Sequence, residues 1–263
     1  MYDYVEIAVG SPQHRGRLIA KKDLVNYIKP DTPLFRSVYL YTKEAAEYAE
    51  ANNGLKNYFG PRSIDWILMD IDKANNSDEY TLNKARSVMI KLEEMGVDIK
   101  WSTQPYFSGS GYHIAVHSSV FNFPSSDNLH YLVKGTLKGL FGDEIDNSIY
   151  MRTGIYRVQH TINKKTNLHK IPLTWEDIIH KEYTDIQEMA KEPRLDFAYS
   201  ELVGNGELED RIANRAPRMT QIRKVVEPKD VIPCVQEMLT NGPQEGSRNQ
   251  TLIRIASHFF RHG

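Results

Sequence analysis

The stretch DWILMDIDK, Asp65–Lys73, decides the fold that we expect for this chain. Residues 66–71 are a run of β-forming residues, and side chains two positions apart on a strand point the same way. Asp70 and Asp72 therefore share one face of the predicted strand, while apolar residues lie on both faces. This pattern is typical of a buried strand in the centre of a sheet.

The two carboxylates at the end of this strand predict a metal site. Carboxylates this close repel each other, and both ionise readily only when a cation joins them. Mg²⁺ takes oxygen ligands, typically one or two carboxylates together with substrate phosphates. Taken alone, the pair leaves three interpretations open: a solvated turn, a catalytic metal site, and the acidic pair of a metal-dependent glycosyltransferase.

The bulk composition narrows the class of protein. The chain has 263 residues, of which 40% are hydrophobic and 25% charged, and its net charge is −1. This length predicts one or two domains. Cys234 is the single cysteine, so an internal disulfide and a multi-cysteine zinc knuckle are excluded. No apolar run reaches the roughly 20 residues of a membrane span, and the first residues do not form a secretory signal. We expect no zinc, no membrane partner and a cytoplasmic location.

Positive charge gathers in two stretches despite the balanced total. Between Asp146 and Glu176 there is no acidic residue. Such a run is often a solvated face, but here it is interleaved with strand-like residues, so several cations are expected to point one way. The cations of this first stretch are Arg152, Arg157, Lys164, Lys165 and Lys170. The second stretch holds Arg211, Arg215, Arg218, Arg223 and Lys224.

Periodicity and capping residues place further elements around the acidic strand. We expect a strand at 36–42, helices at 42–54, 81–95 and 128–141, and a short helix capped by Thr174. Two strand-like runs flank the link Ser108–Gly111, whose glycines let the backbone approach a ligand and form an anion-binding nest. His113 follows this link, where a phosphate-bearing ligand could meet it. We assign His117 a structural role.

In this order, the motifs resemble the archaeo-eukaryotic primase superfamily, in particular the primase-polymerases of phages and plasmids. MDIDK is similar to the first motif of that family, SGSGYHI to the second, and the segment 145–173 to the third. The family has serine two residues before the histidine of the second motif. Gly111 stands there instead, which leaves Ser108 and Ser110 as the candidate serines. The resemblance covers roughly residues 35–175, and a further part at 228–262.

The resemblance implies an α+β fold with an RRM-like primase-polymerase core. It places an N-terminal α/β part and the catalytic domain at residues 1–205, a linker at 206–227 and a small C-terminal helical module at 228–263. It implies metal ligands at Asp70, Asp72 and Asp146, with Asp143 and Glu144 as alternatives to the last. The implied nucleotide-binding residues are Ser108, Ser110, His113, Arg157 and Lys165.

The function implied is that of a DNA primase/polymerase, which performs template-directed nucleotidyl transfer on single-stranded DNA with two Mg²⁺ or Mn²⁺ ions, in the replication of a phage or mobile element. Expected partners are the template, a primer, a (deoxy)nucleoside triphosphate and a helicase, in trans or fused downstream, because the chain has no Walker A pattern. Two alternatives remain. A glycosyltransferase leaves the basic stretch after Asp146 unexplained, and a non-catalytic replication-initiation or nucleic-acid-binding module has no use for three acids.

Overall fold

The acidic strand β4 (Trp66–Ile71) lies in a four-stranded antiparallel sheet of order β10-β5-β6-β4. It pairs along its whole length with β6, so that Asp70 stands opposite His113. On its other side the backbone N–H of Asp146 donates to the carbonyl oxygen of Asp70 at 2.7 Å. The strand therefore has neighbours on both sides, as its apolar faces predict. The other strands are β5 (Thr103–Phe107), β6 (Tyr112–His117) and β10 (Ile171–Pro172).

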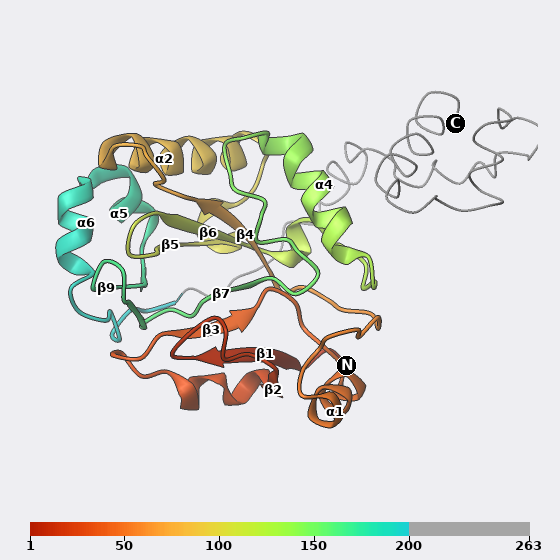
Figure 1. Cartoon of the computed structure of the whole chain (residues 1–263). Coiled ribbons are helices and arrows are strands. Elements are labelled where there is room, and N and C mark those ends of the chain that lie inside the picture. The colour runs from red at the N-terminus through yellow and green to blue at the C-terminus, as the bar shows by residue number, and fades with distance from the viewer. Residues whose placement is uncertain (200–263) are drawn as a thin grey trace, which may run out of the picture. The chain divides into compact units, whose positions relative to one another are not determined.

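Helices cover one face of this sheet, with α2 and α4 lying across it (Figure 1). Helix α2 begins after Ser77, whose side chain accepts from the N–H of Tyr80, and its buried side chains recur at helical spacing. Burying each large apolar side chain contributes roughly 2 kcal/mol, so this face holds the helix in place. The helices of this layer and the sheet ends are α2 (Asp78–Glu94), α3 (Ile99–Ser102), α4 (Leu129–Phe141), α5 (Trp175–His180) and α6 (Tyr183–Met189), with the 3₁₀ turn η2 (Ser118–Val120).

A second antiparallel sheet, of order β2-β1-β3-β7, forms a separate layer below the first in Figure 1. Its last strand comes from the basic stretch, so residues 155–157 return to the N-terminal part of the chain and pair with β3. A two-stranded hairpin, β8 with β9, follows it. The elements are β1 (Tyr4–Val9), β2 (Arg17–Ala20), η1 (Lys21–Tyr27), β3 (Leu34–Ser37), α1 (Lys43–Asn52), β7 (Ile155–Arg157), β8 (Ile162–Asn163) and β9 (Leu168–His169).

The helices expected from the sequence are confirmed within two or three residues, and Thr42 and Thr174 cap α1 and α5. The strand expected at 36–42 is wrong in extent, because β3 ends at Ser37. The hydroxyl of Ser37 donates to the carbonyl oxygen of Tyr39 at 2.6 Å and accepts from the N–H of Glu6 at 3.0 Å. This local bonding turns the chain out of the ladder.

The structure is a computed structural model that describes residues 1–199, and these belong to one compact unit. Its antiparallel sheets and packed helices confirm the predicted α+β class. The predicted linker at 206–227 and helical module at 228–263, together with the boundary at 205, lie outside the described residues. Of the helices in residues 1–199, none combines the length and apolar character needed to cross a membrane.

Candidate metal centre

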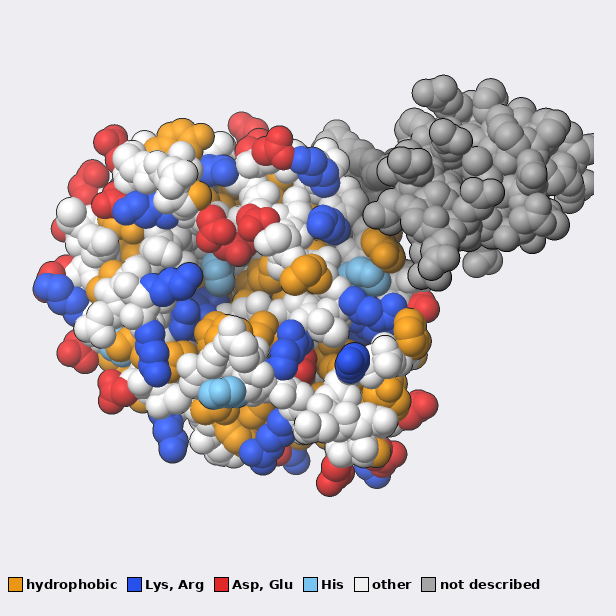
Figure 2. All heavy atoms as spheres, viewed as in Figure 1, with side chains coloured by type: hydrophobic (Ala, Val, Ile, Leu, Met, Phe, Trp, Pro, Cys, Tyr) orange, Lys and Arg blue, Asp and Glu red, His pale blue; other side chains and the backbone are white. Residues whose placement is uncertain are grey.

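A cleft of about 400 Å³ is lined by residues of both sheets. Asp70, Asp72 and His113 line it from the sheet that contains β4, and Phe35 and Arg157 from the N-terminal sheet. Figure 2 shows acidic side chains gathered on this face beside a hollow, with a histidine next to them and Lys and Arg side chains on either side. The cleft thus brings acidic, basic and aromatic groups to one place.

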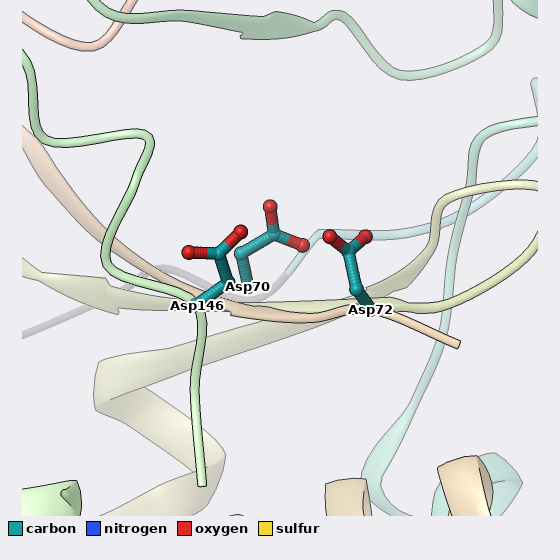
Figure 3. Close-up of side chains that lie close together, drawn as sticks. All are labelled: Asp70, Asp72 and Asp146. Atoms are coloured by element: carbon teal, nitrogen blue, oxygen red, sulfur yellow. The ribbon is translucent and has the colours of Figure 1, made fainter. Parts of the chain in front are cut away.

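Three carboxylates converge at one edge of the cleft (Figure 3). Asp70 lies at the end of β4, Asp72 follows two residues later, and Asp146 belongs to the segment that bridges β4. One carboxylate oxygen of each lies within 4.8 Å of the others. Ser148 orients the third carboxylate, because its N–H donates to Asp146 Oδ1 at 2.7 Å and its hydroxyl to Oδ2 at 2.8 Å.

The three carboxylates repel one another, and this repulsion is visible in the pKa of Asp72. Burial raises the pKa of Asp72, and the charges of Asp70 and Asp146 raise it further, while Lys165 and Lys84 oppose the shift. Like charges held this close are unfavourable without a cation between them. Three convergent carboxylates are the oxygen donors that hard divalent ions prefer, so this triad could bind a metal ion.

The two alternative acids of the third motif are engaged elsewhere. Asp143 is exposed and forms an ion pair with Lys138. Glu144 accepts from Lys91 Nζ at 2.6 Å. Neither belongs to the group formed with Asp70. Of the three candidates for the third carboxylate, the structure therefore brings Asp146 to the acidic strand.

His113 lies beside the triad with a fixed orientation. Its Nε2 is 3.3 Å from Asp70 Oδ1, and Lys170 Nζ donates to its Nδ1 at 2.9 Å. Because Nδ1 accepts this bond, the ring proton is placed on Nε2, which faces Asp70. Burial and the charge of Lys170 lower the pKa of His113, against the charge of Asp70. The imidazole is therefore a neutral hydrogen-bond donor at neutral pH.

Lys170 is a site residue whose position the sequence did not reveal beyond its place in the basic stretch. It is 1% exposed, its Nζ also donates to the carbonyl oxygen of Arg157 at 2.9 Å, and it lies 4.7 and 4.9 Å from the ring centroids of Tyr106 and Tyr156. Burial lowers its pKa to about 7. A lysine next to a histidine in the sequence reads as a solvated residue, and no pattern marks it as buried.

The Ser/Gly link forms the tight turn between β5 and β6. The N–H of Ser108 donates to Gly111 O at 2.9 Å, and its hydroxyl accepts from the N–H of Gly111 at 3.2 Å. A Cβ at Gly111 would lie 2.3 Å from the carbonyl oxygen of Ile71, so this backbone has no space for the serine that the family places here. Ser108 and Ser110 both line the cleft. Within residues 1–199, the Ser110 hydroxyl has no hydrogen-bond partner, so it is available to a ligand.

The two predicted cations lie on different elements. Arg157, on β7, lines the cleft, donates to the carbonyl oxygen of Ile162 at 2.7 Å and stacks 4.9 Å from the ring centroid of Phe35. Burial lowers its pKa to about 10. Lys165 is exposed in the turn of the β8–β9 hairpin and does not line the cleft, but its charge acts on Asp72. The structure thus brings Lys165 near the acids from outside the cleft.

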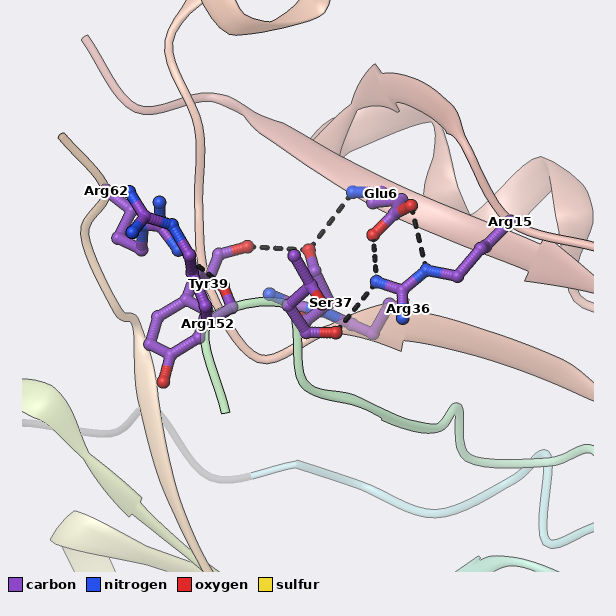
Figure 4. A network of polar contacts seen from close by, with 8 residues as sticks. Glu6, Arg15, Arg36, Ser37, Tyr39, Arg62 and Arg152 are labelled. Carbon is purple, nitrogen blue, oxygen red and sulfur yellow. Dashed lines mark hydrogen bonds and ion pairs between the residues drawn. The ribbon is translucent and has the colours of Figure 1, made fainter. Parts of the chain in front are cut away.

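Arg15 is a cleft residue that sequence reasoning missed. Its guanidinium forms a double contact with Glu6, with Nε 3.0 Å from Oε1, and donates to the carbonyl oxygen of Thr153 at 2.8 Å (Figure 4). Glu6 is 2% exposed and anchors the guanidinium at the rim of the cleft. The only signal in the sequence is an arginine in a polar loop between glycines, which is too common to identify a site.

The cleft is defined by the polar groups that surround it. Three acids, a neutral histidine, two arginines and a free hydroxyl surround one space, and they come from segments far apart in the chain. This arrangement suits a ligand that carries both a metal ion and anionic oxygens. Neither a protein-family model nor a curated protein matches this chain, so its function is inferred from this geometry.

Proposed function

We propose that this protein is a DNA primase/polymerase that transfers nucleotides to a growing strand on a single-stranded DNA template. The observation that carries the proposal is the convergence of Asp70, Asp72 and Asp146 beside a neutral His113 and basic residues in one cleft. Acids alone suit many metal sites. Acids opposite guanidinium groups suit a metal-bound polyphosphate.

The order of elements supports an RRM-like core of the kind that the resemblance implies. Strand β4, helix α2, strands β5 and β6 and helix α4 follow one another, and Asp146 then bridges back to β4. In space, β4 lies between this bridge and β6, and β6 lies between β4 and β5. If the bridge at Asp146 is counted as a last, one-residue strand, this order matches a βαββαβ arrangement with its first strand in the centre. The acidic motif at the end of that strand thus occupies the position expected for the metal ligands.

Each predicted site residue has a role in this proposal. Asp70, Asp72 and Asp146 would hold two Mg²⁺ or Mn²⁺ ions, which when bound activate the attacking hydroxyl and neutralise the pyrophosphate leaving group. The Nε2–H of His113 donates to a phosphate oxygen of the incoming nucleotide. The guanidinium of Arg157 grips phosphate oxygens as a planar fork, and Lys165 adds a point charge from the hairpin.

Arg15 and the Ser/Gly link complete the nucleotide site. Glu6 and the carbonyl oxygen of Thr153 take the Nε and Nη2 donors of Arg15, which leaves Nη1 for an anion at the rim of the cleft. The free hydroxyl of Ser110 and the close backbone of the link face the same space. We assign Ser110, rather than Ser108, as the serine that contacts nucleotide, because Ser108 Oγ is held in the turn by the N–H of Gly111, whereas no bond within residues 1–199 holds the hydroxyl of Ser110.

The proposal is tested by incubating the full chain with primed and unprimed single-stranded DNA, labelled ribo- and deoxyribonucleotides, and Mg²⁺ or Mn²⁺. Asp70→Ala is expected to reduce extension at least about a thousandfold, since loss of ~4 kcal/mol of transition-state stabilisation has this effect. Asp143→Ala is the matched control, because it removes a nearby carboxylate that lies outside the triad, and it should keep wild-type activity.

The same experiment separates the alternatives. Products from unprimed template indicate a primase, and products from primed template alone indicate a polymerase. Near-normal extension by Asp70→Ala contradicts the assignment of the triad. A wild-type chain that binds DNA but extends no strand with either metal favours a non-catalytic binding module, and turnover of a nucleotide sugar without DNA favours a glycosyltransferase.

A further inference from the structure

A second group of cations lies beside the cleft and has no carboxylate partner within residues 1–199. Arg62 donates from Nη1 to the carbonyl oxygen of Arg152 and from Nη2 to that of Gly60 at 3.4 Å. Figure 4 shows the two arginines next to each other. Within residues 1–199, the arginines that form ion pairs are Arg15, Arg36 and Arg194, as given by their contacts with acids. Neither Arg62 nor Arg152 is among them.

Several buried polar atoms around these arginines have no partner in the described part of the chain. Arg62 is 1% exposed, yet its Nε has no acceptor, and the same holds for Arg152 Nη2 and His130 Nδ1. Burying a charged donor without an acceptor is unfavourable. Burial lowers the pKa of Arg62, and the charge of Arg152 lowers it further, although Tyr41 opposes the shift. An anion bound at the surface above these groups would supply opposite charge.

Two exposed aromatic rings lie in this group, one against Arg152 and one against His130. The guanidinium carbon of Arg152 is 4.4 Å from the ring centroid of Phe59, which is 66% exposed. The ring of Tyr131, 61% exposed, lies 4.0 Å from that of His130, centroid to centroid. Large exposed aromatic faces next to positive charge are the combination with which proteins bind single-stranded nucleic acid, since bases stack on the rings and phosphates meet the cations. We call Phe59, Arg62, His130, Tyr131 and Arg152 the aromatic–arginine patch.

The patch is continuous with the cleft. Met151, Thr153 and Gly154 line the cleft, and Arg152 is part of the same segment. The bond from Arg62 to the backbone of Arg152 fixes this segment between the two places. In Figure 2, Lys and Arg side chains gather with a histidine on the face that also presents the acidic group. The segment around Arg152 thus connects the cleft with the patch.

We propose that the aromatic–arginine patch binds the single-stranded DNA template where it leaves the cleft, with a backbone phosphate at Arg152 and a base stacked on Phe59. Arg62 lies beneath and adds charge to the phosphate site. The direction of the strand rests on the proposed function, whereas binding itself requires neither metal nor catalysis.

The test measures the affinity of the full chain for fluorescein-labelled oligothymidylate of 20 residues, by anisotropy in EDTA and without nucleotide. Phe59→Ala and Arg152→Ala are each expected to weaken binding about tenfold, in the range found when a stacking residue is removed. Arg152→Ala should also reduce the slope of log affinity against log salt by about 0.7, the value for one phosphate on a single strand, while Phe59→Ala should not.

Lys100 and Trp101 provide the matched control. They form an exposed cation–aromatic pair, with Lys100 Nζ 5.7 Å from the ring centroid of Trp101, on α3, which precedes the end of β5 remote from the Ser/Gly link. Lys100→Ala and Trp101→Ala should bind as the wild type does. Unchanged affinity of folded Phe59→Ala and Arg152→Ala variants, or an equal loss in the control pair, overturns the proposal. If the patch variants lose binding but the wild type extends no strand, the proposed function fails and the patch stands.

Discussion

The two ends of strand β4 hold carboxylates in opposite electrostatic situations. Asp65, just before the strand, lies 3.1 Å from Arg36 Nη2 and 2.9 Å from Lys21 Nζ. Burial acts to raise its pKa, but the charges of Arg36 and Lys21 bring it below the usual value. Asp72, just after the strand, has a raised pKa, because burial and two neighbouring carboxylates act in the same direction.

The first end of β4 thus stabilises the fold, whereas the second end is suited to bind a ligand. At the first end, the chain supplies the counter-charges itself, and the side chains of Asp65 and Arg36 are only 11% and 7% exposed. At the second end, the chain supplies three acids, and among the described residues Lys165 and Lys84 offset their repulsion only in part. A protein keeps such a group when a ligand completes it. The aromatic–arginine patch has the same character with the opposite sign of charge.

We expect the largest effect on the free energy of unfolding from removing Asp65, the paired carboxylate before β4. Asp65→Ala leaves the Arg36 guanidinium buried without its partner, so we expect a loss of roughly 3–5 kcal/mol in the free energy of unfolding. Asp72→Ala removes a like charge instead, and its free energy of unfolding should equal or slightly exceed that of the wild type. Urea unfolding of the three proteins in EDTA measures both. A comparable loss in the two variants contradicts the distinction between the ends of β4.

The buried Lys170 is expected to make the free energy of unfolding depend on pH, with an effect of intermediate size. Its pKa in the folded protein is about 7, against 10.5 for an ordinary lysine. Between these values the unfolded chain binds more protons than the folded protein, so stability rises with pH in this window. From pH 7 to 9 this contributes about 2 kcal/mol. Lys170→Met should lose that increment while keeping the apolar packing between Tyr106 and Tyr156.

The measurement is the difference in urea unfolding free energy between pH 7 and pH 9, for the wild type and the variant. Lys181, which is 40% exposed, supplies the control, because Lys181→Met should keep the wild-type slope. An unchanged slope in Lys170→Met would show that the ammonium stays charged throughout the range. The charged ammonium of Lys170 would then donate to His113 throughout this range, and other groups would cause the pH dependence of stability.

The sequence could predict the acidic strand, the helices and the link, because each follows a short periodic or capping pattern. The Asp70–Asp72 pair is visible because two residues set its geometry. The position of Asp146 required the resemblance, since no local pattern brings it beside β4. The end of β3 at Ser37 was not predictable, because the hydroxyl of Ser37 accepts from the N–H of Glu6 on β1 as well as donating to the nearby carbonyl oxygen of Tyr39.

The residues that the sequence did not identify owe their position to distant partners. Arg15 is placed by Glu6 on β1 and by the carbonyl oxygen of Thr153, far along the chain. Lys170 is buried because Tyr156 on β7 and Tyr106 on β5 lie around it, and the pairing of β10 with β5 brings Lys170 to Tyr106. Such positions depend on the pairing of strands across the two sheets, which composition and periodicity do not encode.

We expect the smallest effect on stability from the binding of a metal ion to the carboxylates after β4. A ligand that binds only the folded protein stabilises it by RT ln(1 + [L]/Kd), about 1.4 kcal/mol at ten times Kd. Mg²⁺ or Mn²⁺ should therefore raise the midpoint of thermal unfolding by a few degrees in the wild type and in Asp143→Asn. Asp72→Asn removes a ligand and should abolish the rise, although it starts with equal or higher stability in EDTA. A rise of the same size in Asp72→Asn would place the ion away from the triad, since removing one of three close carboxylates must weaken any site that they form together.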